Sequence, residues 1–211
     1  MRLSTLDVYL QAVIAVVIIV NPVDPVKIMI FNSVITRRGL DRRKAAAQVA
    51  VVALAILGVS ALVGKELLQV IGINLGAFGV IGGLVVAGMG FEMLYGGTSS
   101  RVQGSGEARD EPTEADGLIM PLTTPLMAGP GAIATVITVA SYRGSWTSLT
   151  AAVVAVAFTS ALVYVGFAYL GAAFEKLTPA AAAILARVGG LLLATIGAQL
   201  VLGGLRTFYG S

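Results

Sequence analysis

Long apolar runs separated by short polar segments constrain this chain more than any other feature of its sequence. The runs cover six stretches, at residues 6–35, 44–63, 72–95, 117–141, 146–174 and 180–205. Each is long enough to cross a hydrocarbon core of about 30 Å, which takes roughly 20 helical residues. The sequence therefore predicts an all-α integral membrane protein with six transmembrane helices and the lipid bilayer as its main partner.

The composition excludes several other classes of protein. With 57% hydrophobic and 12% charged residues, the chain of 211 residues has more apolar surface than a soluble globule can bury. It contains no cysteine and no histidine, so disulfides, Cys/His metal sites and the usual neutral-pH general base are excluded, and carboxylates are the expected proton carriers. We predict no enzymatic activity, no cofactor, no metal site and no nucleic-acid partner.

The charge of the first loop predicts the orientation in the membrane. A single acid, Asp41, lies there among the basic residues Arg37, Arg38, Arg42, Arg43 and Lys44. The positive-inside rule puts such a loop in the cytoplasm. No small-residue cleavage site follows the first apolar run, so we interpret that run as an uncleaved helix. The chain is then a multi-pass protein of the prokaryotic cytoplasmic (inner) membrane with both termini outside.

An internal repeat relates the third apolar run to the sixth at an offset of 107 residues. The shared residues are Gly82, Gly83, Leu84, Ala87, Gly90, Gly96 and Gly97, which fall on Gly189, Gly190, Leu191, Ala194, Gly197, Gly203 and Gly204. An odd number of crossings per repeat inserts the second half from the opposite side, so the halves are inverted, as in many secondary transporters. We predict a first three-helix repeat at 1–97, a flexible cytoplasmic linker at 98–116 and a second, inverted three-helix repeat at 117–211.

Glycine also recurs within the third apolar run itself. Gly79 and Gly83 form a small-xxx-small step. Such steps let the backbones of two membrane helices approach each other closely. We therefore interpret these glycines as helix contacts rather than as ligand contacts.

Prolines and glycines interrupt the first helix of each predicted half. The first break is Asn-Pro-Val-Asp-Pro at 21–25, and the second comprises Pro-Leu-Thr-Thr-Pro at 121–125 and Ala-Gly-Pro-Gly at 128–131. The prolines of the first break are expected to free the carbonyls of Ile18 and Asn21. Groups freed in this way persist at membrane depth only where protein or a polar cavity surrounds them. A simple kink is the alternative for either site alone, but paired breaks favour a transporter site.

The ends of a broken helix predict the kind of ligand. Bare N–H groups at a half-helix N-terminus attract a carboxylate, and free carbonyls attract a cation or an ammonium group, so a zwitterionic amino acid suits both. No aromatic cluster lies near the breaks, which indicates a small substrate. The predicted substrate-binding residues are Asn21, Pro22, Asp24, Thr123, Thr124, Gly129, Pro130 and Gly131.

Three ionisable residues lie within the predicted spans, namely Asp24, Lys27 and Glu92. Charges inside a membrane are costly, so they are candidates for function. Asp24 and Glu92 are the predicted coupling residues. Asp24 could instead be neutralised by Lys27, three residues later. Glu92, whose repeat partner is Gln199, could instead extend to the cytoplasmic interface.

Several strings in the sequence resemble the MarC family of six-helix bacterial and archaeal membrane proteins. They are Asn21-Pro22, Ile81-Gly82-Gly83-Leu84, Glu92-Met93-Leu94-Tyr95-Gly96 and, most specifically, Pro125-Leu126-Met127-Ala128-Gly129-Pro130-Gly131-Ala132-Ile133-Ala134-Thr135. The resemblance covers nearly the whole chain, but the first motif departs from the family pattern at Asp24, Pro25 and Lys27. It implies an inner-membrane protein related to SnatA-type carriers of glycine, alanine and other small neutral amino acids, driven by a proton gradient.

These observations together predict a secondary active transporter that works by alternating access. Its coupling ion is expected to be a proton, with sodium as the alternative, and its oligomeric state stays open. A passive channel or an exporter for another small polar solute would fit the breaks as well. An intramembrane hydrolase that pairs Asp24 with Glu92 is disfavoured, because nothing in the sequence brings the two carboxylates within reach of each other.

Overall fold

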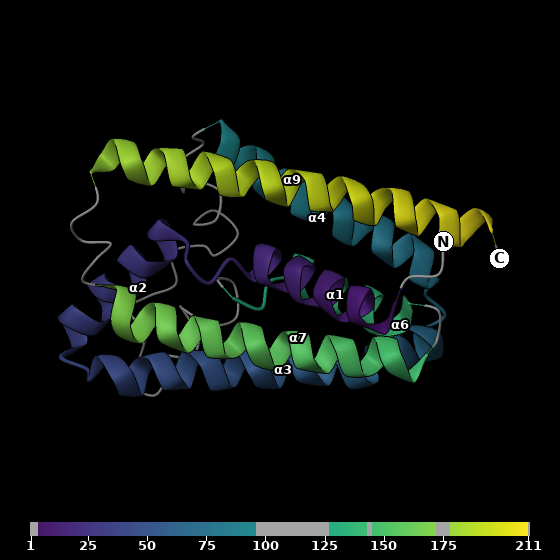
Figure 1. Ribbon diagram of the computed structural model, residues 1–211, viewed down its shortest axis with the longest axis horizontal. Helices are drawn as coiled ribbons and strands as arrows, with labels where there is room; N and C mark the ends of the chain where they lie inside the picture. Colours follow the sequence, from purple (N-terminus) through teal and green to yellow (C-terminus); the bar gives the residue numbers. More distant parts are fainter. Residues whose placement is uncertain (1–3, 96–126, 143–144, 172–177, 211) are drawn as a thin grey trace.

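The computed structural model describes residues 4–95, 127–142, 145–171 and 178–210. In chain order the elements are α1 (Thr5–Val20), α2 (Pro25–Arg38), α3 (Arg42–Ile71), α4 (Leu75–Leu94), α6 (Pro130–Ser141), α7 (Trp146–Val165), the π-helix η2 (Gly166–Leu170) and α9 (Pro179–Tyr209) (Figure 1). No strand occurs among the described residues, which confirms the all-α class.

Four of these helical segments are long and apolar enough to cross a membrane. They are α3, α4, the continuous segment of α7 and η2, and α9. Only 22% of the most apolar stretch of α9 is buried within the protein, so most of that stretch faces outward. Apolar surface exposed to this extent is stable in lipid and unstable in water. The structure therefore supports a multi-pass membrane protein.

The observed helices differ from the six predicted spans in three places. The first span is divided, because α1 ends at Val20 and α2 begins at Pro25, which confirms the predicted break. Only α6 represents the fourth span, since residues 117–126 lie outside the described part of the chain. The second span is longer than predicted: α3 has 30 residues, roughly 45 Å of helix, and continues through Lys65 and Glu66. Charged residues at a helix end lie at the membrane interface without cost, so the apolar run alone underestimates the helix.

Helix caps define the start of α3 and the turn from α3 into α4. Asp41 accepts a hydrogen bond from the backbone N–H of Lys44 at 3.0 Å. Backbone N–H groups of Lys44 and then Arg43 stabilise its charged form and hold the pKa of Asp41 below its ordinary value. At the other end, Gly72 adopts φ +80° and Asn74 accepts from the N–H of Gly76 at 2.7 Å. The chain thus turns directly from α3 into α4.

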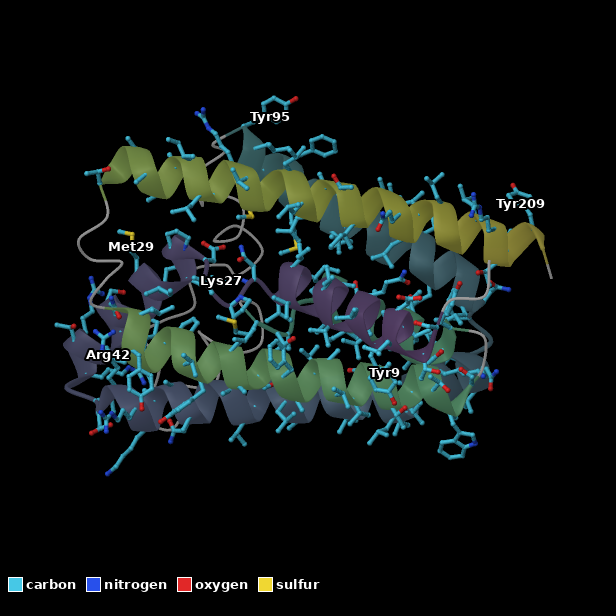
Figure 2. All side chains as sticks on the ribbon, in the orientation of Figure 1. Tyr9, Lys27, Met29, Arg42, Tyr95 and Tyr209 are labelled. Carbon is cyan, nitrogen blue, oxygen red and sulfur yellow. The ribbon has the colours of Figure 1, made fainter. Side chains whose placement is uncertain are left out.

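The helices form three layers in Figure 1. The pair α4 and α9 lies along one side, α3 and α7 lie along the other, and α1 and α6 lie between them. The central helix α6 contacts α1, α3, α4 and α7. The start of α1 and the end of α9 lie at the same end of the bundle, and Arg42 lies at the opposite end (Figures 1 and 2). This arrangement agrees with an even number of membrane crossings.

Glycines allow α4 and α9 to pack closely in antiparallel directions. The facing pairs are Gly76 with Gly204, Gly83 with Gly197 and Gly90 with Gly190. A Cβ atom on Gly197 would overlap the backbone nitrogen of Ala87 and lie 2.7 Å from the carbonyl oxygen of Gly83. Because neither backbone can give way locally, a side chain there would force the helices apart. Gly79 also faces α9, so the prediction that these glycines make helix contacts is confirmed.

Two alanine substitutions on α9 test this close contact. We expect Gly197→Ala to lower the free energy of unfolding by about 1–3 kcal/mol, because the added methyl group meets backbone atoms. Gly203→Ala is the matched control on the same helix, since nothing lies within 4 Å of a Cβ at that position. Alanine favours helix over glycine, so the control should be neutral or slightly stabilising. Thermal unfolding of purified protein in detergent measures both, and equal effects would contradict the account.

Candidate functional site

The first break is a sharp turn in which Asn21 adopts a left-handed backbone conformation, with φ +44°. Its N–H still donates to the carbonyl of Val17 at 2.8 Å, so α1 is regular up to this residue. Asparagine is one of the few residues that tolerate this conformation, which explains its place at the end of the helix. One detail of the prediction is wrong: the carbonyl of Asn21 is not freed by Pro25, because it accepts from the N–H of Asp24 at 3.3 Å.

Three polar side chains gather at this break, and we call Asn21, Asp24 and Lys27 the break cluster. The side chain of Asp24 is buried, and its carboxylate accepts from the Asn21 amide at 3.4 Å. The ammonium group of Lys27 donates to the carbonyl oxygen of Val20 at 2.7 Å. Asp24 also attracts Lys27 electrostatically. The structure thus favours the alternative in which these two charges interact.

Glycines from two other elements cover the first break. A Cβ atom on Gly166, at the start of η2, would lie 2.9 Å from the carbonyl oxygen of Pro22. A Cβ on Gly189 of α9 would lie 3.5 Å from the amide nitrogen of Asn21. Neither glycine is among the site residues that the sequence predicts, and no sequence pattern predicts η2, although π-helical turns often mark functional sites. The only available signal was the position of Gly189 within the repeat.

The second break produces the predicted half-helix N-terminus. Helix α6 begins at Pro130, and its first residue outside the helix, Gly129, provides no capping side chain. Gly131 is buried, and a Cβ there would lie 2.6 Å from the side chain of Val86. The hydroxyl of Thr135 donates to the carbonyl of Gly131 at 2.9 Å. The remaining predicted residues of this break, Thr123 and Thr124, lie outside the described residues.

The two breaks belong to one packed unit. Helix α1 contacts α6, and Val20, Met127 and Ala128 are members of the same buried apolar cluster. Figure 1 shows that α1 ends near the middle of the bundle rather than at one of its ends. The end of α1 carries a partial negative charge and the start of α6 a partial positive charge. The two helix ends therefore carry opposite partial charges.

Glu92, the second predicted coupling residue, is not part of the break cluster. Its side chain is exposed on α4, and the side chain of its repeat partner Gln199 is exposed on α9. Within the described part of the chain Glu92 makes no hydrogen bond or ion pair. Its neighbour Met93 is the residue that approaches Gly189. The exposure favours the alternative in which Glu92 extends to the membrane interface.

A separate cavity of about 180 Å³ lies where α3, the end of α6 and the start of α7 meet. Its polar lining residues are Lys65, Glu66, Ser141 and Ser145, together with Trp146. The pair Tyr9 and Thr150, whose hydroxyls are 2.7 Å apart, joins α1 to α7 near this end of the bundle. The sequence did not predict this cavity, because Lys65 and Glu66 fall outside the predicted second span. Helix α6 connects it to the breaks.

Comparison with known proteins agrees with the fold. Residues 6–209 match the family model described as MarC family integral membrane protein. A UPF0056 membrane protein of Pyrococcus abyssi (strain GE5 / Orsay) is 30% identical over 210 residues, which cover 99% of each chain. The UPF0056 membrane protein YhcE of Escherichia coli (strain K12) is 27% identical over 203 residues, covering 96% of this chain and 94% of that protein. No solved structure matches the chain.

The conformation of Asn21 generates a stability prediction. We expect Asn21→Ala to destabilise the protein by about 1–2 kcal/mol, because alanine is strained at positive φ. Asn21→Gly loses the same side-chain hydrogen bond but fits the backbone, so it should be more stable than the alanine variant. Thermal unfolding in detergent compares the two directly. A glycine variant no more stable than the alanine variant would show that the backbone conformation does not matter.

Proposed function

The chain belongs to the MarC family of integral membrane proteins, and from that premise we propose that it is a secondary active transporter. In this proposal it moves glycine, alanine and other small neutral amino acids across the cytoplasmic membrane by alternating access. One observation carries the proposal: the uncapped N-terminus of α6, which follows the buried Gly129, and the C-terminus of α1 at the buried Val20 both lie within the packed bundle. Interrupted helices of this kind form the central sites of many transporters.

The chemistry of the two helix ends suits an amino acid. The N–H groups of Gly131 and Ala132, which no side chain caps, would bind the substrate carboxylate. The carbonyl end of α1, where Pro22 has no N–H to donate to the carbonyl of Ile18, would bind the substrate ammonium group. Gly166 and Gly189 bring η2 and α9 close to the break, so only a short side chain would fit.

The glycine contacts of α4 and α9 support two inverted halves. At the repeat offset of 107, Gly83 corresponds to Gly190 and Gly90 to Gly197. Gly83 contacts Gly197 and Gly90 contacts Gly190, so replacing each glycine by its repeat partner turns the first contact into the second. A two-fold axis in the membrane plane relates the two contacts in the same way. Two related halves could rock against each other and open the site to either side.

Charge supports an orientation and a coupling mechanism. In our proposal the basic loop at residues 37–44 faces the cytoplasm and both termini face outside. Asp24, the buried carboxylate of the break, would carry the coupling proton. A passive channel is the alternative function. Saturable counterflow of labelled alanine distinguishes the two, because a channel shows none.

Reconstitution tests the proposed function. We expect purified protein in liposomes to accumulate labelled glycine or alanine when an inward proton gradient is imposed. Gly189→Val should weaken uptake by about tenfold or more, because its side chain enters the space beside Asn21. Gly203→Val, the same change at an open position on the same helix, should leave uptake unchanged. Gradient-dependent uptake of no small amino acid at all would refute the proposal, and unchanged uptake by Asp24→Asn would exclude Asp24 as the coupling group.

A further inference from the structure

The break in α1 leaves a buried carbonyl that the helix itself does not satisfy. In a continuous helix the carbonyl of Val20 would accept from the N–H of Asp24. That N–H donates to Asn21 instead. Val20 is only 1% exposed, so water does not solvate this region freely. An unsatisfied carbonyl in such a position is costly, and a donor has to come from elsewhere.

Lys27 supplies that donor from the first turns of α2. Its ammonium nitrogen lies 2.7 Å from the Val20 oxygen, and Figure 2 shows the residue beside the break, within the bundle. The negative end of the α1 dipole favours a cation at this point. The Asp24 carboxylate, held by the amide of Asn21, attracts the same ammonium group. The ammonium group of Lys27 therefore lies at a backbone oxygen, three residues after the Asp24 carboxylate that attracts it.

The same oxygen groups would bind a monovalent metal cation. Sodium and related hard cations prefer carboxylate and backbone carbonyl oxygens, and carbonyls at helix breaks coordinate sodium in many transporters. In this chain the ammonium of Lys27 already occupies that position. A tethered cation needs no binding from solution and is always present.

We propose that Lys27 is a built-in substitute for a coupling cation, and that its ammonium group closes a latent sodium site formed by Val20 and Asp24. Sodium then neither binds at the break nor stimulates the wild-type protein. Removal of the ammonium group opens the site to sodium. The consequence for transport rests on the proposed function, whereas the cation site itself does not.

Cation-dependent stability tests the site without any transport assay. Full-length Lys27→Ala protein in detergent should unfold about 2–4 °C higher in sodium chloride than in choline chloride at equal ionic strength. The wild type should unfold at the same temperature in both salts. The double variant Lys27→Ala with Asp24→Asn should lose the sodium effect, because the carboxylate charge is gone. Binding of radioactive sodium should appear in Lys27→Ala and in neither the wild type nor the double variant.

A second variant covers the case in which Lys27→Ala does not fold. Lys27→Met keeps most of the apolar stem and removes only the charge, so it should fold and show the same sodium response. A sodium effect in the wild type would overturn the proposal. So would the absence of one in a folded Lys27 variant, or failure of both variants to fold even in sodium.

Transport separates the cation site from the proposed function. In liposomes, wild-type alanine uptake should be equal in sodium and choline, whereas uptake by Lys27→Ala should rise several-fold with sodium. If Lys27→Ala binds sodium but no form of the protein transports alanine, the cation site stands and the proposed function fails. If wild-type uptake depends on sodium, the proposed role of Lys27 fails and the transporter function stands.

Discussion

A backbone carbonyl or amide inside a membrane has to find a partner within the protein, and this requirement governs the centre of the molecule. The chain breaks α1 at residues 21–24, where proline prevents a continuous helix. Three residues then shape the break. Asn21 turns the backbone, Asp24 closes the turn, and Lys27 reaches back to the carbonyl of Val20. The break is therefore a specified structure and not a kink in a long helix.

Close approach of neighbouring helices is the second condition for this arrangement. Gly166 and Gly189 let η2 and α9 cover the break, and facing glycines hold α9 against α4. Glycine is costly in a helix interior, since it lowers helix propensity by about 1 kcal/mol relative to alanine. Its use at these contacts follows from the need to bring backbones together in lipid, where the hydrophobic effect does not drive helix association. The contacts of Gly166 and Gly189 connect the break to η2 on one side of the bundle and to α9 on the other.

The sequence predicted the features that depend on local chemistry. Apolar run length gave the membrane class, Pro22 and Pro25 located the break, and the spacing of Gly79 and Gly83 indicated helix contact. Features that depend on tertiary neighbours were not accessible in this way. No motif distinguishes the π-helical turn at Gly166 from an ordinary helix, and no pattern shows that Lys27 would reach Val20 rather than solvent. The length of α3 was underestimated because Lys65 and Glu66 end the apolar run but not the helix.

If the α1 break lines a solute pathway open in turn to both sides of the membrane, a single thiol beside the break is accessible from either side. The chain has no cysteine, so Gly189→Cys gives a single thiol beside Asn21, and Gly203→Cys gives a control exposed on the same helix. A membrane-impermeant thiol reagent is applied to right-side-out and to inside-out vesicles. We expect Gly189→Cys to react from both sides and to be slowed by alanine, whereas Gly203→Cys should react slowly and be unaffected by alanine. Reaction of Gly189→Cys from one side only, or from neither, would contradict such a pathway.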